Sequence, residues 1–141
     1  MKPQIATTPE QSKRLLACGV NPDSADMFYT NYTTKPNDKA PCTKTAPLGI
    51  RKDLIPAWSL SALLALLPTS LTSAMGNKYM LELSKLRMHN AWEVQWFNGR
   101  ERWCTVDKDK KYHKLWDESP LEACVKAIEW LTANGYTLNT K

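Results

Sequence analysis

The 141-residue chain is short of several residues that common functional sites need. Its five glycines never form a GxGxxG or P-loop pattern, which excludes the usual glycine-rich phosphate-binding loops. Neither of its two histidines follows a recognisable nucleophile motif. The four cysteines are widely separated, with no CxxC and no Cys/His pair at zinc-finger spacing. The sequence therefore predicts no metal site and no cofactor, and it favours a protein that is not an enzyme.

Long apolar segments are also missing. The longest, Leu60–Leu67, stops at Pro68 and is far shorter than the roughly 20 residues that cross a bilayer. The first six residues, MKPQIA, lack the apolar centre of a signal peptide. Hydrophobic residues make up 43% and charged residues 23%, which is typical of a globular domain. We expect one domain over residues 1–141, without membrane attachment, with free thiols in a reducing cytoplasm.

Helix start and stop signals predict four helical segments. Thr8–Gln11 reads as a capping box with proline at the first helical position, and Gly19 can end that helix. A second start at Asn21–Ser24 predicts a short helix carrying Met27 and Phe28, and so a helical hairpin at the N-terminus.

The other two helices carry clear apolar stripes. Ser59 is a plausible N-cap for the apolar segment over Leu60–Leu67. Ser119–Glu122 is a capping box that opens a helix ending near Asn134-Gly135. Its predicted buried stripe is Leu121, Cys124, Val125, Ile128 and Leu131.

The middle of the chain has β-strand patterns. Residues 79–84 alternate, and the runs 92–97 and 100–106 flank Asn98-Gly99, a strong signal for a two-residue hairpin. That register places Phe97 opposite Arg100. One face then holds Trp92, Val94, Trp96 and Trp103, and the other holds Glu93, Gln95, Phe97, Arg100, Arg102 and Cys104. We expect the tryptophan face to be core.

Helices before and after a run of strands predict an α+β fold, with an antiparallel meander sheet of three to four strands packed against helices. Between them lies a long, basic, proline-containing loop at about 29–57. A structureless loop of this length is uncommon inside a domain, so it is functional, partly mobile, or contains a short hairpin. Tyr29 and Tyr32 either anchor it or stack on a ligand, and anchoring is favoured.

The net charge of +5 favours anionic partners. Arginine binds phosphate through two parallel hydrogen bonds, and aromatic rings stack on nucleic-acid bases. Basic and aromatic side chains gather on the outer hairpin face and just after it. The candidate ligand-binding residues are Phe97, Arg100, Arg102, Lys110, Lys111 and Tyr112. The alternative is a solvated sheet edge that lysines protect from pairing.

Several strings have a familiar order and spacing: Glu10–Leu16, Pro56–Pro68 and Ser119–Cys124, followed by Trp130-Leu131 and Asn134-Gly135. Together they resemble small uncharacterised proteins encoded by bacteriophages and mobile elements of gut anaerobic bacteria. The resemblance implies expression in the cytoplasm of a bacterial host and an accessory role. Small phage accessory proteins often bind host proteins or host signalling nucleotides, and the resemblance implies no catalytic residue.

The sequence thus favours a non-enzymatic phage accessory protein that sequesters an anionic ligand, either a nucleotide signal or nucleic acid. The second hypothesis is a protein–protein inhibitor or assembly factor that acts on a host or phage protein through the segment Tyr29–Ala57. The third is an enzyme of unknown type, which requires His89 or His113 buried beside a carboxylate. A homo-oligomer is compatible with all three.

Overall fold

The computed structural model describes residues 4–30, 42–43, 54–87, 90–103 and 115–139. These residues form helices α1 (Pro9–Ala17), α2 (Leu60–Leu66) and α3 (Pro120–Ala133), and a 3-10 turn, η1 (Pro22–Ser24). The strands are β1 (Met27–Thr30), β2 (Cys42–Thr43), β3 (Leu54–Ala57), β4 (Ser70–Thr72), β5 (Lys78–Leu86), β6 (Ala91–Phe97) and β7 (Trp116–Asp117).

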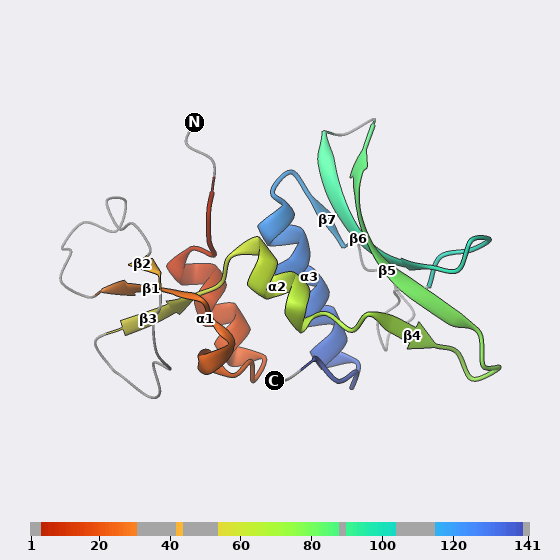
Figure 1. Ribbon diagram of the computed structural model, residues 1–141, viewed down its shortest axis with the longest axis horizontal. Helices are drawn as coiled ribbons and strands as arrows, with labels where there is room; N and C mark the ends of the chain where they lie inside the picture. Colours follow the sequence, from red (N-terminus) through yellow and green to blue (C-terminus); the bar gives the residue numbers. More distant parts are fainter. Residues whose placement is uncertain (1–3, 31–41, 44–53, 88–89, 104–114, 140–141) are drawn as a thin grey trace.

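The strands form two antiparallel sheets, and the helices lie between them (Figure 1). The smaller sheet has the order β2-β1-β3. The larger one has the order β4-β5-β6-β7, which is a meander because neighbours in space are neighbours in sequence. It is strongly curled, with β5 and β6 as its long central pair (Figure 1). The α+β class and the four-stranded meander are therefore confirmed, whereas β4 was not predicted.

The N-terminal segment begins as predicted and then departs from the prediction. The Thr8 hydroxyl accepts from the Gln11 amide, and the Gln11 side chain accepts from the Thr8 amide, so the capping box is present. Gly19 follows α1 with φ +86°. The second helix is only the single turn η1, and Met27 and Phe28 lie in β1. A helical hairpin is thus not confirmed, because pairing with β2 and β3 fixes these two residues as a strand.

The segment expected to be a long loop contributes strands to the smaller sheet, although residues 31–41 and 44–53 lie outside the described part of the chain. Phe28 pairs with Cys42 on one side and with Pro56 on the other. A proline is tolerated there because β3 is an edge strand. Tyr29 is 5% exposed and donates to the Thr7 carbonyl at 2.8 Å, so it anchors the sheet as predicted. Tyr32 lies outside the described residues.

One large cluster of buried side chains joins the helices to the larger sheet. Trp58 and Trp96 are fully buried, and their indole nitrogens donate to Ser24 Oγ and to the Pro68 carbonyl, both at 2.9 Å. The five residues of the predicted α3 stripe are all at most 2% exposed. Leu16, which was expected on the apolar side of α1, is instead 39% exposed.

The turn after β6 is wider than predicted. Phe97 pairs with Arg102 rather than with Arg100, and the Trp103 amide donates to the Trp96 carbonyl at 2.7 Å. A two-residue turn needs positive φ at both positions, but of Asn98 and Gly99 only the glycine has one, at +93°. The pairing has therefore moved by two residues. Because side chains alternate, the shift leaves Trp103 on the inner face and Arg102 on the outer face.

Candidate ligand-binding pocket

A pocket of about 390 Å³ lies where the turn after β6 meets the end of α3. It combines aromatic rings with an acid, a base and an amide. Its lining residues are Tyr79, Glu101, Arg102, Trp103, Trp130, Asn134 and Tyr136. This composition is typical of ligand sites, where aromatic walls carry a few polar groups that orient the ligand.

Local structure brings the four rings together. Trp103 lies opposite Trp96 after the turn, and Trp130 lies on the last turns of α3. Gly135, with φ +79°, reverses the chain after α3, and the Tyr136 amide then donates to the Leu131 carbonyl at 2.9 Å. Tyr136 is thereby folded back beside the helix that carries Trp130.

The rings hold one another in place. Trp103 meets Tyr79 edge-to-face at 5.1 Å between centroids, and it meets Tyr136 in the same way at 6.2 Å. Tyr136 is stacked on Trp130 at 5.3 Å. Such pairs are worth about 0.5–1.5 kcal/mol each beyond the area that they bury. The aromatic wall is therefore preorganised.

The acid at the pocket is fixed by its neighbours. Glu101 Oε1 accepts a hydrogen bond from the Tyr79 hydroxyl at 2.7 Å. This bond is the main reason why the pKa of Tyr79 is raised, so the phenol keeps its proton at neutral pH. Asn98 Oδ1 accepts from the backbone amides of Arg100 and Glu101, both at 2.9 Å. The carboxylate thus projects from a turn that the Asn98 side chain organises.

The structure brings together some of the predicted site residues. Arg102 lines the pocket, but its Nη1 lies 2.8 Å from Glu93 Oε1 in an ion pair. The Arg102 side chain is 54% exposed and the Glu93 side chain only 7%, so part of the Arg102 guanidinium is committed to a buried carboxylate. Arg100 is exposed on the turn, and Phe97 is half-buried beside Arg102 on the outer face. Lys110, Lys111 and Tyr112 lie outside the described residues.

Most of the pocket was not predicted. Trp103 was assigned to the core, although it is only half-buried and reaches the pocket. Tyr136 follows the expected helix stop, and an aromatic residue directly after a C-terminal glycine is a signal that a ring folds back on the helix. Glu101 was not among the candidate residues, because the predicted two-residue turn leaves no room for the observed turn of four residues.

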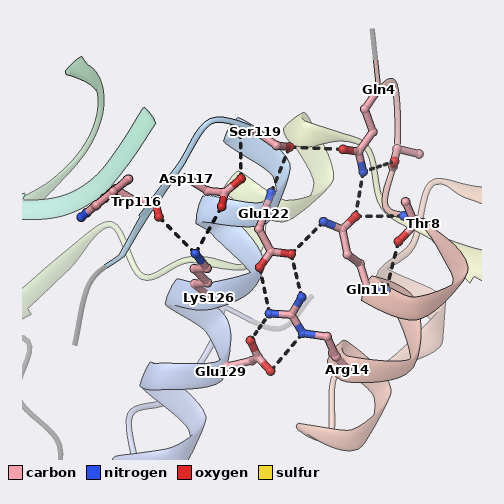
Figure 2. Close-up of polar contacts among 11 residues, drawn as sticks. Gln4, Thr8, Gln11, Arg14, Trp116, Asp117, Ser119, Glu122, Lys126 and Glu129 are labelled. Atoms are coloured by element: carbon pink, nitrogen blue, oxygen red, sulfur yellow. Dashed lines mark hydrogen bonds and ion pairs between the residues drawn. The ribbon is translucent and has the colours of Figure 1, made fainter. Parts of the chain in front are cut away.

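A second polar cluster lies between α1 and α3 (Figure 2). Arg14 Nη1 and Nη2 donate to the two oxygens of Glu122 at 2.6 and 2.9 Å, and its Nε donates to Glu129 at 3.2 Å. Arg14 Nη2 also bonds Glu129. Gln11 donates to Glu122 at 2.9 Å and accepts from Gln4. These bonds raise the pKa of Arg14 and use all three of its nitrogens, so we interpret the cluster as a clamp between helices.

A larger cavity, of about 760 Å³, lies beside α2. Its lining consists largely of small and aliphatic side chains, including Ala62, Ala65 and Leu66. Two of its polar side chains already serve the fold. Ser24 accepts from Trp58, and Asn139 donates to the Leu67 carbonyl at 2.9 Å. The smaller aromatic pocket is the stronger candidate, because it has both stacking surfaces and charges.

No protein-family model, curated protein or solved structure matches this chain. The described segments contain no group of His, Cys, Asp and Glu side chains that could hold a metal ion. Within the same segments, no helix is long and apolar enough to cross a membrane. His89 and His113 lie outside the described residues. The functional argument therefore depends on the geometry of the pocket.

Proposed function

We propose that the protein binds a small nucleotide without catalysing a reaction, with the base in the aromatic pocket and the phosphate beside Arg100 and Arg102. The observation that carries the proposal is the joining of four aromatic rings with Arg102 in one pocket wall. Stacking on aromatic side chains contributes about 1–3 kcal/mol per base. Arginine is the side chain best suited to a phosphate, because its planar fork matches the oxygens.

The charges at the rim support an anionic ligand. Arg100 is exposed and makes no ion pair with any other described residue. Among the described residues, one carboxylate, that of Glu93, pairs with Arg102, and a phosphate can compete for its exposed side. The overall charge of +5 speeds the encounter with anions.

The chemistry of the described residues supports binding over catalysis. The Tyr79 phenol donates its proton in a hydrogen bond to Glu101, and this bond raises its pKa further above neutral pH. Cys124 is fully buried, and burial raises the pKa of its thiol to about 12, so it is not a nucleophile at neutral pH. Neither group is prepared for acid–base or covalent chemistry.

The resemblance to phage proteins suggests where such binding is useful. A small protein that sequesters a signalling nucleotide lowers its free concentration in an infected cell. The competing hypothesis, an inhibitor acting through residues 29–57, falls largely on 31–41 and 44–53, outside the described residues. Among the described residues, no observation favours it over the pocket.

Calorimetry and thermal unfolding with GMP, AMP, CMP, UMP, a short oligonucleotide and inorganic phosphate test the proposal. At least one nucleotide should raise the thermal midpoint, because binding stabilises the folded state by mass action. Arg100→Glu should weaken binding at least about tenfold at low salt without changing the midpoint of the free protein. Arg87→Glu is the matched control, since Arg87 is also exposed but follows the end of β5, whereas Arg100 lies on the turn that carries Glu101. If no nucleotide stabilises the protein, or if Arg100→Glu binds as well as the control, the proposal is wrong.

A further inference from the structure

We propose that the pocket selects guanine among the bases, an inference that rests on the proposed nucleotide binding. It comes from counting which polar atoms of the lining side chains remain available to a ligand. The two relevant side chains are Glu101 and Asn134, which lie in the pocket wall with the four rings.

Two side-chain oxygens in the wall, Glu101 Oε2 and Asn134 Oδ1, accept no hydrogen bond from the described residues, whereas Arg102 and Tyr136 add donors to the same wall. The Tyr79 hydroxyl, the one phenolic donor bonded within the wall, already donates to Glu101 Oε1. Asn134 Nδ2 donates one of its two hydrogens to the Trp130 carbonyl at 2.8 Å, which holds the amide in place with Oδ1 as its acceptor. No described residue donates to Glu101 Oε2. A base that pairs with Glu101 must therefore supply hydrogen-bond donors, because a carboxylate can only accept.

Of the four bases, guanine supplies the most hydrogen-bond donors on one edge. Its N1–H and N2–H₂ groups are adjacent, so a single carboxylate can accept from both. Adenine and cytosine each place one amino group beside a ring nitrogen that is itself an acceptor. Uracil has one N–H between two carbonyl oxygens, and those oxygens repel a carboxylate. Glu101 is thus matched to guanine and mismatched, in part or fully, to the other three bases.

Glu101 is held ready for this contact. The hydrogen bond from Tyr79 fixes one carboxylate oxygen and leaves the other available. The turn that carries Glu101 is tied by Asn98, whose amide also donates to the Glu101 carbonyl at 3.3 Å. Tyr79 is accordingly a positioning residue: it acts on the base through Glu101.

A small organic cation is also rich in donors and also favours aromatic rings. The charges at the rim disfavour it, because Arg102 lines the same pocket and Arg100 lies on the same turn. Agmatine, which carries a guanidinium but no phosphate, is therefore the probe that separates this occupant from a nucleotide.

Calorimetry on the full chain with GMP, IMP and AMP tests the inference. GMP should bind about tenfold or more tightly than AMP, since a bidentate contact to a base commonly discriminates by that factor or more. IMP keeps N1–H and lacks the N2 amino group, so its affinity should lie between the two. Glu101→Gln should bring the GMP-to-AMP affinity ratio close to one, whereas Glu118→Gln, an exposed acid outside the pocket lining, should leave it unchanged.

Tyr79→Phe keeps the ring and removes the hydroxyl, so it should lower the GMP-to-AMP ratio while AMP affinity stays the same. A purely structural role of Tyr79 would instead weaken both ligands equally. Equal binding of GMP and AMP by the unmodified protein overturns guanine selection and leaves nucleotide binding intact. Binding of agmatine with no response to any nucleotide overturns both proposals.

Discussion

Arg14 and Arg102 are both arginines that meet carboxylates, but their surroundings differ. Arg14 spends every guanidinium nitrogen on Glu122 and Glu129 between two helices. Within the described segments, Arg102 forms one ion pair, with Glu93, on a sheet face beside a pocket. A guanidinium such as that of Arg14, in which each of the three nitrogens is bonded to a carboxylate, holds the fold together. One with donors to spare can also meet a ligand, and this contrast separates the clamp from the candidate site.

The largest expected effect is at the clamp. Arg14→Met should lower the free energy of unfolding by about 2 kcal/mol, because Glu122, whose side chain is 16% exposed, loses its cation. Urea unfolding of Arg14→Met and of the exposed control Lys13→Met measures the difference. Nucleotide affinity should not change. A loss as small as that of the control would show that the clamp contributes little to folding.

Alkaline pH separates the clamp from the core, because bonds to Glu129 and Glu122 raise the pKa of Arg14 above its already high ordinary value. Burial raises the pKa of Cys124 from 9.0 to about 12, so its contribution to stability is complete below pH 9 and is lost as pH rises toward 12. The free energy of unfolding should fall by about 1.4 kcal/mol per pH unit in that window. The raised pKa of Tyr29 adds to the fall above pH 10.

Urea unfolding between pH 8 and 11 measures how steeply the free energy of unfolding falls with pH. Cys124→Ala should flatten it, leaving the part due to tyrosine, and Cys18→Ala should not. An unchanged slope in Cys124→Ala would exclude the buried thiol as its cause.

The turn that carries Glu101 offers a smaller effect. Gly99→Ala should cost about 1 kcal/mol, because φ +93° is strained for any residue with a side chain. Gly76→Ala places the same strain, at φ +86°, in the turn between β4 and β5. Both variants should unfold more easily, but only Gly99→Ala should weaken GMP binding. Equal GMP binding by the two variants would show that the turn at Gly99 does not contribute to the binding site.

The smallest expected effect sharpens the comparison most directly. Glu93→Gln removes the charge that holds Arg102, so nucleotide affinity should rise about threefold. Glu82→Gln is the control, since Glu82 is an exposed acid on the neighbouring strand. Weaker binding by Glu93→Gln would mean that Glu93 orients Arg102 for the ligand rather than competing with it.

Features set by a few neighbouring residues were predicted well. The caps at Thr8, Ser59 and Ser119 are present, and the α3 stripe is buried, because both depend on spacing along one helix. The wide turn at Asn98 was missed, since an Asn-Gly pair favours a tighter one. Met27 and Phe28 became a strand through pairing with distant residues, a contact that local helix signals do not contain.

The candidate site was predicted only in part, for the same reason. Arg102 was identified from charge, but its pairing with Glu93 follows from the observed register and the curl of the sheet. The aromatic wall joins residues from β5, the turn after β6 and the end of α3. No pattern along the chain marks such a set, because its members meet only after the sheet and helix have packed.

The last described residues have a mechanical consequence. Beyond Tyr136, the chain is fastened to the end of α2 by two hydrogen bonds from Asn139, to the carbonyls of Leu66 at 2.8 Å and Leu67 at 2.9 Å. One end of this short strap is therefore a ring of the pocket, and the other end is the helix beside the larger cavity. A ligand that displaces Tyr136 therefore also strains the hydrogen bonds of Asn139 to the end of α2. The two pockets are thus coupled through a segment only a few residues long.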